Sequence, residues 1–241
     1  MDIKALAQDA APYVVERRHY YHQHPELTGE EKNTRDAIHR DLEALGITDI
    51  RDMVNCYGLV ATIHGGKPGK TVGLRADTDA LSFQEETGLP FASCEPGKMH
   101  ACGHDTHIAM LLGAAKLLQE HREELRGDVR LIFQPAEEGV RGAYAIVENG
   151  WLDDVDVLLA SHIAPTGQAD DGDVTVGTWG SLATTKYDAV FTGRAAHAGG
   201  FPEQGKNALL AAASAALALH AIPRHGGGCL LYTSDAADDL T

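Results

Sequence analysis

Apolar residues recur every three or four positions in two stretches near the N-terminus, which is the spacing of an amphipathic helix. The first stretch covers about residues 2–22. The second follows the sequence TGEE at residues 28–31, which fits a capping box, and continues to Gly46. The chain is therefore expected to begin with two helices joined by a short loop.

Two more helices are predicted further along the chain. The stretch DTHIAMLLGAAKLLQEHREEL, residues 105–125, has a strong helical pattern, and Asp105 is a plausible N-cap. A shorter pattern, RGAYAIVENG, ends at Gly150, where glycine favours termination of a helix. A long segment without a clear pattern, residues 78–103, precedes the first of these two helices.

Four short apolar runs have the length and composition of β-strands. They are GLVATIHG (58–65), TVGLRAD (71–77), DVRLIFQ (128–134) and VDVLLASH (155–162). The sequence GGKPGK between the first two runs predicts a hairpin turn. The last two runs are continuously apolar, which is typical of buried strands.

Strands that alternate with helices predict an α/β fold in which helices cover both faces of the sheet. The pattern then changes to a Gly- and Asp-rich connector at 165–181, a strand-like alternation at 184–195 and an alanine-rich helix at 203–222. We therefore predict a first domain at 1–180 and the beginning of a smaller α+β domain at 181–225.

The charge of the chain narrows the possible partners. Its 35 acidic and 20 basic side chains give a formal net charge of −15, which repels phosphate backbones, so no nucleic-acid partner is expected. The N-terminal residues are too charged for a signal peptide. The longest apolar run, which starts at Ala208, is too short for a membrane span and is interrupted by polar residues, so no membrane association is expected.

The four cysteines, Cys56, Cys94, Cys102 and Cys229, are far apart and form no CxxC pair. This spacing excludes a disulfide framework and a zinc ribbon, and it favours a reduced, cytoplasmic protein. A redox function of Cys102 is disfavoured because no resolving cysteine lies near it.

The sequence GKMHACGHDTHIAM concentrates metal-capable side chains just before the third helix. Cys102 and His104 are two residues apart, so in an extended segment their side chains leave the same face. A thiolate and an imidazole on one face are able to bind the same metal. Their place before a helix N-terminus is also expected to favour ionisation of the thiol.

Two further groups of polar residues follow predicted strands. Glu137 and Glu138 come after DVRLIFQ, where one carboxylate could bind metal while the other handles protons. His162 ends VDVLLASH, and Asp77 and Asp79 lie at the end of TVGLRAD. Active sites of open α/β sheets lie beyond the carboxyl ends of strands. The two aspartates could bind metal, but they are expected instead to support Cys102 and His104 from behind.

Five pieces of the chain together resemble the metal-dependent amidohydrolases of the peptidase M20 family. They are RRHYYHQHPEL, RADTDAL, MHACGHDTHIAMLLGAAKLL, VRLIFQPAEEGVRGA and GRAAHAGGFPEQGKNALLAA, which span nearly the whole chain. Within the family, the last piece is most similar to the branches that cleave aminobenzoyl-glutamate and N-acyl amino acids.

The resemblance implies a zinc-exopeptidase-like catalytic domain with a mixed sheet, two divalent metal ions (Mn or Zn) and an inserted lid domain that forms a homodimer. Cys102, His104, Glu138 and His162 match the metal ligands, and Glu137 matches the general base. The implied reaction is hydrolysis of an amide bond in an N-acyl or aminobenzoyl amino acid. A metal-bound hydroxide attacks the amide, and Glu137 passes the water proton to the leaving amine.

His197 matches a lid histidine that reaches the active site of a partner subunit and stabilises the developing oxyanion of the substrate. Asn207, Arg194 and Lys206 lie near it in sequence as candidate carboxylate-binding residues. A second kind of subunit remains possible under this resemblance. The alternative to an enzyme is a non-catalytic metal-binding or scaffold protein of the same fold. Retention of Glu137 favours the enzyme.

The last residues, 226–241, fit neither predicted domain. The sequence CLLYTSDAADDL resembles a translated sequencing adaptor, and the family pattern implies a further histidine ligand that nothing in this stretch replaces. We therefore expect a chain truncated near His225 and completed by a non-native tail. Such a chain is expected to fold poorly, to bind metal weakly and to be inactive by itself, because a lid of one strand and one helix cannot cover its own apolar faces.

Overall fold

The computed structural model describes residues 2–139, 142–164, 172–175, 177 and 188–220. The chain divides into two compact units, Met1–Asp173 and Val174–Thr241. Most of the predicted connector and the whole of the expected non-native tail lie outside the described residues.

The first unit begins with helices α1 (Ile3–Gln23) and α2 (Lys32–Ala44). The capping box predicted for α2 is wrong, because neither of its polar side chains caps the helix. Thr28 instead donates its hydroxyl to Asp79, and the carboxylate of Glu31 accepts the backbone N–H of Ala136. The carboxylate of Glu26 accepts the N–H of Thr34 in the first turn of α2, so a residue outside the motif satisfies that helix end.

Helices α3 (His104–Glu120) and α4 (Gly142–Glu148) confirm the two later helix predictions, and a short 3₁₀ helix (Arg122–Glu124) follows α3. The N-cap of α3 is Gly103, not Asp105. Gly103 has a φ of +91°, a left-handed conformation that glycine adopts without a steric penalty. Asp105 is left free to bond outside its own helix.

The described part of the chain contains the strands β1 (Asp49–Asp52), β2 (Leu59–Ile63), β3 (Val72–Asp77), β4 (Val129–Gln134) and β5 (Val157–Ala160). They form one mixed sheet in the order β1-β2-β4-β3-β5. β1 and β2, and β2 and β4, pair antiparallel, whereas β3 pairs in parallel with both β4 and β5. The hairpin predicted from GGKPGK is wrong, because β4 lies between the two strands that the turn joins.

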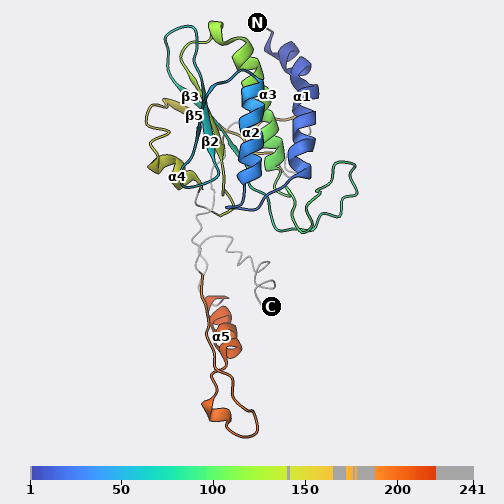
Figure 1. Cartoon of the computed structure of the whole chain (residues 1–241), viewed down its shortest axis with the longest axis vertical. Coiled ribbons are helices and arrows are strands. Elements are labelled where there is room, and N and C mark those ends of the chain that lie inside the picture. Colours follow the sequence, from blue (N-terminus) through green and yellow to red (C-terminus); the bar gives the residue numbers. More distant parts are fainter. Residues whose placement is uncertain (1, 140–141, 165–171, 176, 178–187, 221–241) are drawn as a thin grey trace. The chain divides into compact units, whose positions relative to one another are not determined.

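Apolar side chains cover both faces of this sheet, as the fold class predicts. α1, α2 and α3 lie on one face of the sheet (Figure 1). Their apolar side chains pack over alternate residues of β4, such as Leu131 and Phe133. On the other face Ile132 packs against Ile146 of α4. The alternation follows from the two-residue period of a strand. The α/β fold with a mixed sheet flanked by helices is therefore confirmed.

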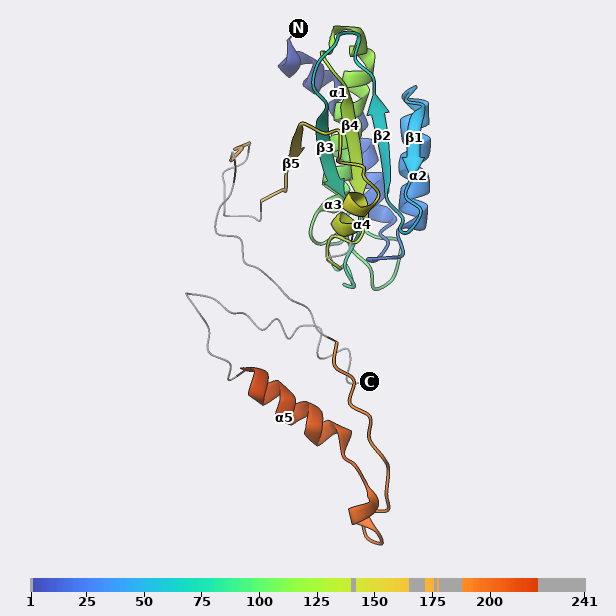
Figure 2. The ribbon, with the colours of Figure 1, turned by 90° about the vertical axis from the view of Figure 1, so that its left-hand side faces the viewer.

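β5 differs from the other strands in burial. It was predicted to be buried, but all four of its residues are exposed. It lies at the edge of the described sheet, beside β3 (Figure 2). An apolar run indicates a strand but does not determine which elements pack on it, so burial could not be predicted from the run alone.

In the second unit the alanine-rich helix is confirmed as α5 (Ala208–His220), preceded by a 3₁₀ helix, Pro202–Gln204. The strand predicted at 184–195 is absent from its described part, residues 188–195, apart from one isolated bridge between Arg194 and Lys206. The first four residues of that prediction lie outside the described residues.

Candidate metal centre

The carboxyl ends of three parallel strands lie at one end of the sheet. Asp77, the last residue of β3, is in register with Gln134, the last residue of β4. β5 runs parallel to β3, so the segment that carries His162 also leaves at this end. The parallel register therefore gathers the polar residues that follow the strands.

His104 is fully enclosed, with none of its side chain exposed. Its Nδ1 donates to the backbone carbonyl of Asp79 over 2.8 Å. Its Nε2 is buried and has no hydrogen-bond partner, although an oxygen of Asp77 lies 3.7 Å away. A buried imidazole nitrogen without a partner is costly, and a metal ion would satisfy it.

Cys102 lies close to His104 and His162. The Cys102 Sγ is 3.4 Å from the His162 Nε2, and the donor atoms of all three residues lie within 4.8 Å of one another. Burial, and then the charge of Glu138, raise the pKa of Cys102 to about 12. Burial and this charge therefore oppose the ionisation of the thiol that the helix N-terminus is expected to favour. A cation at this place would be needed to favour the thiolate.

The Glu137–Glu138 turn is held from two sides. Ala136 has a φ of +52°, which is uncommon for a residue with a side chain. Glu31 accepts the N–H of Ala136 over 2.8 Å, and Asp79 accepts the N–H of Glu138 over 3.0 Å. These bonds offset the local strain that directs the two carboxylates toward His104.

Donor atoms of His104, Glu137 and Glu138 also lie within 4.8 Å of one another. His104 is thus shared between this group and the one that contains Cys102 and His162. Burial, and then the neighbouring Glu138, raise the pKa of Glu137 above its ordinary value. The predicted base and the predicted ligands are therefore brought to one place.

Asp77 and Asp79 lie behind the histidines of α3. The Asp77 Oδ1 is 2.5 Å from the His107 Nδ1, and Asp77 also accepts a bond of 2.6 Å from Arg75. Burial alone would raise the pKa of Asp77, but the bond to His107 and the nearby charges of His104 and Arg75 hold it at about 2. The two aspartates bond to His104 and His107, and Cys102 instead faces His162.

Two residues of this region were missed by the sequence analysis. His107 is buried and forms a third possible metal-binding group with Asp77 and His104. Its spacing of three from His104 places both on one helix face, a signal that could have identified it. Glu31 gave no such signal, because its partner is 105 residues away in the sequence.

The candidate substrate residues lie in the second unit. The His197 Nδ1 accepts the backbone N–H groups of Gly199 and Gly200. The side chain of Asn207 accepts the N–H of Leu210 over 3.1 Å, an arrangement that caps the start of α5. Asn207 thus has a local structural role in this unit.

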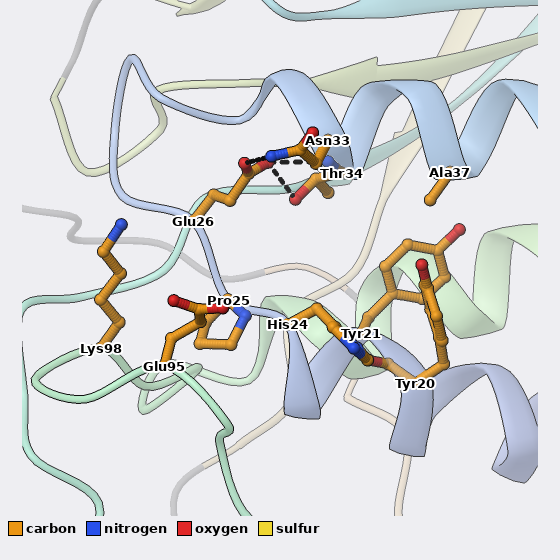
Figure 3. A pocket seen from close by; sticks show the side chains of 10 residues that line it. All are labelled: Tyr20, Tyr21, His24, Pro25, Glu26, Asn33, Thr34, Ala37, Glu95 and Lys98. Carbon is orange, nitrogen blue, oxygen red and sulfur yellow. Dashed lines mark hydrogen bonds between the residues drawn. The ribbon is translucent and has the colours of Figure 1, made fainter.

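A separate cavity of about 300 Å³ lies between the end of α1 and the start of α2, lined among others by Tyr20, His24 and Lys98 (Figure 3). Its central carboxylate, Glu26, already accepts bonds from Asn33 and Thr34 (Figure 3). Because these bonds already occupy the Glu26 carboxylate, we assign this residue a structural role and not a role in binding a ligand. None of the predicted site residues lines it.

The mixed sheet and the thiol, imidazole and carboxylate groups at its end define a protein of the zinc-exopeptidase-like class. The model of peptidase family M20/M25/M40 matches residues 73–237, and the chain belongs to that family.

The chain is similar in sequence to two curated relatives and to one protein of known structure. The chain is 54% identical over 178 residues to the indole-3-acetyl-aspartic acid hydrolase of Enterobacter agglomerans. It is 52% identical over 178 residues to one of the subunits of the p-aminobenzoyl-glutamate hydrolase of Escherichia coli. Each match covers 71% of this chain and 40% of the relative. A dinuclear metal-binding M20 peptidase of Bacillus subtilis is 43% identical, with a TM-score of 0.61 over 68% of this chain and 45% of that chain.

The chain thus spans about two fifths of the length of these curated relatives. No helix in the described part of the chain combines the length and the apolar character that crossing a membrane requires.

Proposed function

We propose that this chain carries the metal-binding and proton-transfer residues of an amidohydrolase that releases an amino acid from its N-acyl or aminobenzoyl amide. One observation carries the proposal. His104, with a buried and unpartnered Nε2, is shared by two donor groups, one with Cys102 and His162 and the other with Glu137 and Glu138. A site of this kind suits two neighbouring cations.

The names of the relatives support the substrate class. Those from Enterobacter agglomerans and Escherichia coli are named for the hydrolysis of indole-3-acetyl-aspartic acid and p-aminobenzoyl-glutamate. Both compounds join an aromatic acyl group to an acidic amino acid through an amide. The proposed substrate is therefore a small N-acyl or aminobenzoyl amino acid.

In this proposal Cys102, His104, Glu138 and His162 hold two divalent ions. A mixture of sulfur, nitrogen and oxygen donors suits zinc and also accepts manganese. When bound, such ions act as Lewis acids that polarise an amide carbonyl and acidify water. The B. subtilis neighbour, described as dinuclear, supports the number of ions.

Glu137 is the proposed proton carrier. It removes a proton from the attacking water and delivers it to the leaving nitrogen of the amide. The strained turn at Ala136, which Glu31 holds through a hydrogen bond, fixes the backbone position from which the Glu137 carboxylate extends. Asp79 orients the His104 ring through its backbone carbonyl and side chain, so that Nε2 faces the site.

The proposal extends to assembly and location. We propose a cytoplasmic homodimer formed through the second unit, in which His197 and Asn207 approach the substrate. A second kind of subunit is also proposed, because the Escherichia coli relative is named as one of the subunits of its hydrolase. Size measurement of the metal-loaded chain, with and without candidate partner chains, tests both points.

The decisive experiment compares the chain with its Glu137→Gln variant. Each is stripped with EDTA, reloaded with Zn²⁺ or Mn²⁺, and analysed for bound metal and for release of glutamate from p-aminobenzoyl-glutamate. The Escherichia coli relative serves as the reference for substrate and loading. We expect Glu137→Gln to keep its metal and to lose at least about a hundredfold in turnover, the contribution of a general base.

Two results would contradict the proposal. Turnover within a factor of two in Glu137→Gln would remove this residue from proton transfer. Metal binding without hydrolysis of any N-acyl amino acid, under conditions in which the reference enzyme is active, would show that this chain by itself is not an amidohydrolase. It would leave the non-catalytic metal-binding or scaffold protein, or the inactive truncated chain expected from the sequence, as the alternatives.

A further inference from the structure

His107 lies in the middle of the site, and both of its ring nitrogens are engaged. Nδ1 is 2.5 Å from the Asp77 Oδ1, and Nε2 accepts the backbone N–H of Ile163 over 3.0 Å. The side chain is only 2% exposed. We infer that His107 is a positioning residue that fastens the segment carrying His162 to α3. We call Asp77, His107 and Ile163 the His107 latch.

The hydrogen bonds select one form of the ring. The backbone N–H of Ile163 can only donate, so Nε2 must be the unprotonated nitrogen. The proton of a neutral ring is then on Nδ1, from which it is donated to Asp77. Asp77 is itself held by Arg75, whose Nη1 is 2.6 Å away. The carboxylate therefore fixes the tautomer that accepts from Ile163.

The same bonds argue against His107 as a metal ligand. Its donor atoms lie within 4.8 Å of those of Asp77 and His104, which by itself would permit metal binding. An ion bound to Nε2 would have to replace the N–H of Ile163, and an ion bound to Nδ1 would have to replace the proton shared with Asp77. The His104 Nε2, by contrast, has no hydrogen bond to lose.

The segment that the latch holds follows β5, whose backbone pairs with β3, but its side chains are open to solvent. All residues of β5 are exposed, and His162 is exposed as well. The His107 and His162 rings meet edge to face, with centroids 4.5 Å apart. A Cβ added at Gly103 would lie 2.1 Å from the Ile163 Cδ1, so this side chain packs directly on the start of α3.

The latch also helps to set the orientation of the His162 ring. The His162 Nδ1 donates to the carbonyl of Ile163 over 2.7 Å, and its Nε2 faces the Cys102 Sγ. The backbone of Ile163 is thus bound on one side by His107 and on the other by His162. Fixing this one residue places the imidazole beside Cys102.

This inference rests on the proposed metal site, because His162 matters as a proposed ligand. The latch is nevertheless measurable in the metal-free chain. The first test uses ¹⁵N NMR of the unsubstituted protein to assign the His107 tautomer. We expect a protonated Nδ1 and an unprotonated Nε2 that is hydrogen-bonded. The reverse assignment would overturn the latch without any variant.

The second test measures amide hydrogen exchange of Ile163 in metal-free variants. His107→Phe fills the space without either bond, and we expect exchange at Ile163 to become at least about tenfold faster. His107→Gln retains an acceptor and a donor, so it should restore part of the protection. Asp77→Asn should behave like His107→Phe. Arg75 can only donate, so the amide oxygen faces Arg75 and the amide NH2 donates to Nδ1, which moves the ring proton to Nε2.

The matched control is His22→Gln. His22 is also a buried histidine bonded to a carboxylate, Asp105, over 2.8 Å, and its other ring nitrogen faces Glu85 rather than Ile163. The substitution should leave the exchange rate of Ile163 within a factor of two. Equal acceleration in His22→Gln and His107→Phe, or none in His107→Phe, would overturn the latch.

The third test is titration with Zn²⁺. A positioning residue next to a ligand typically changes metal affinity by about 10- to 100-fold, so His107→Gln should weaken binding less than His107→Phe while the number of ions at saturation stays the same. Loss of one whole ion in His107→Gln would identify a ligand instead and overturn the inference. If the unsubstituted chain binds no Zn²⁺, the proposed function fails, and the Ile163 exchange rates still decide whether the latch exists.

Discussion

The His104 side and the His162 side of the candidate metal centre are built differently. His104 begins a helix that packs into the core, and none of its side chain is exposed. His162 follows an edge strand whose residues are all exposed. One half of the donor set is therefore positioned by the core itself. The other half depends on a few contacts, among them the bond between the buried His107 ring and Ile163.

The largest expected effect follows from the difference in burial. Truncating an apolar side chain should lower the free energy of unfolding much more in the buried half than in the exposed half. Leu131 in β4 is 0% exposed and Leu159 in β5 is 55% exposed. We expect Leu131→Ala to lower the free energy of unfolding by about 2–5 kcal/mol, as burial of its side chain implies. Leu159→Ala should change it by about 0.5 kcal/mol or less.

Urea denaturation of the metal-free chain measures both variants. Similar losses for the two would mean that β5 is covered in solution and that the contrast between the halves does not hold. A cooperative transition in the unsubstituted chain is the control, and it also tests the expectation from the sequence that this chain folds poorly.

Metal binding should sharpen the difference between the halves. A ligand that binds only the folded state at a hundred times its Kd adds about 2.7 kcal/mol to stability. Because the His104 side is already ordered by the core, we expect Zn²⁺ to slow amide exchange mainly at Ile163 and its neighbours. Exchange measured with Zn²⁺ and with EDTA provides the test. Equal protection across α3 and the His162 segment would contradict the prediction.

The smallest expected effect concerns the contact between the halves. Gly103→Ala adds a Cβ that collides with Ile163 at a residue whose φ is +91°. Gly29 has a similar φ of +81°, with nothing near its added Cβ. Both substitutions should cost about 1 kcal/mol for the left-handed backbone.

Gly103→Ala should carry a further penalty and a weaker affinity for Zn²⁺, whereas Gly29→Ala should leave the affinity unchanged. Calorimetric titration and thermal unfolding measure the two quantities. Identical behaviour of the two variants would mean that Ile163 yields easily and that its packing on Gly103 contributes little.

Much of the site could be predicted because its residues follow regular elements. Cys102 and His104 immediately precede or begin a strongly periodic helix, and Glu137 and Glu138 follow an apolar strand. Parallel strands bring their carboxyl ends together, which makes such residues neighbours. The role of Glu31 could not be predicted, because Thr28 and Glu31 match a local capping motif but bond to residues distant in the sequence.

The sequence by itself determined the helices, the strands β2 to β5 and the set of residues available for metal binding, because a period of 3.6 or 2 and the spacing of polar side chains are local properties. The short strand β1 was not predicted. The tertiary structure alone decided that β4 separates β2 from β3, that β5 is exposed, and that His107 holds Ile163. These outcomes depend on which distant groups compete for the same hydrogen bond or the same apolar face. A local pattern has no information about that competition, because the competing groups meet only after the chain has folded.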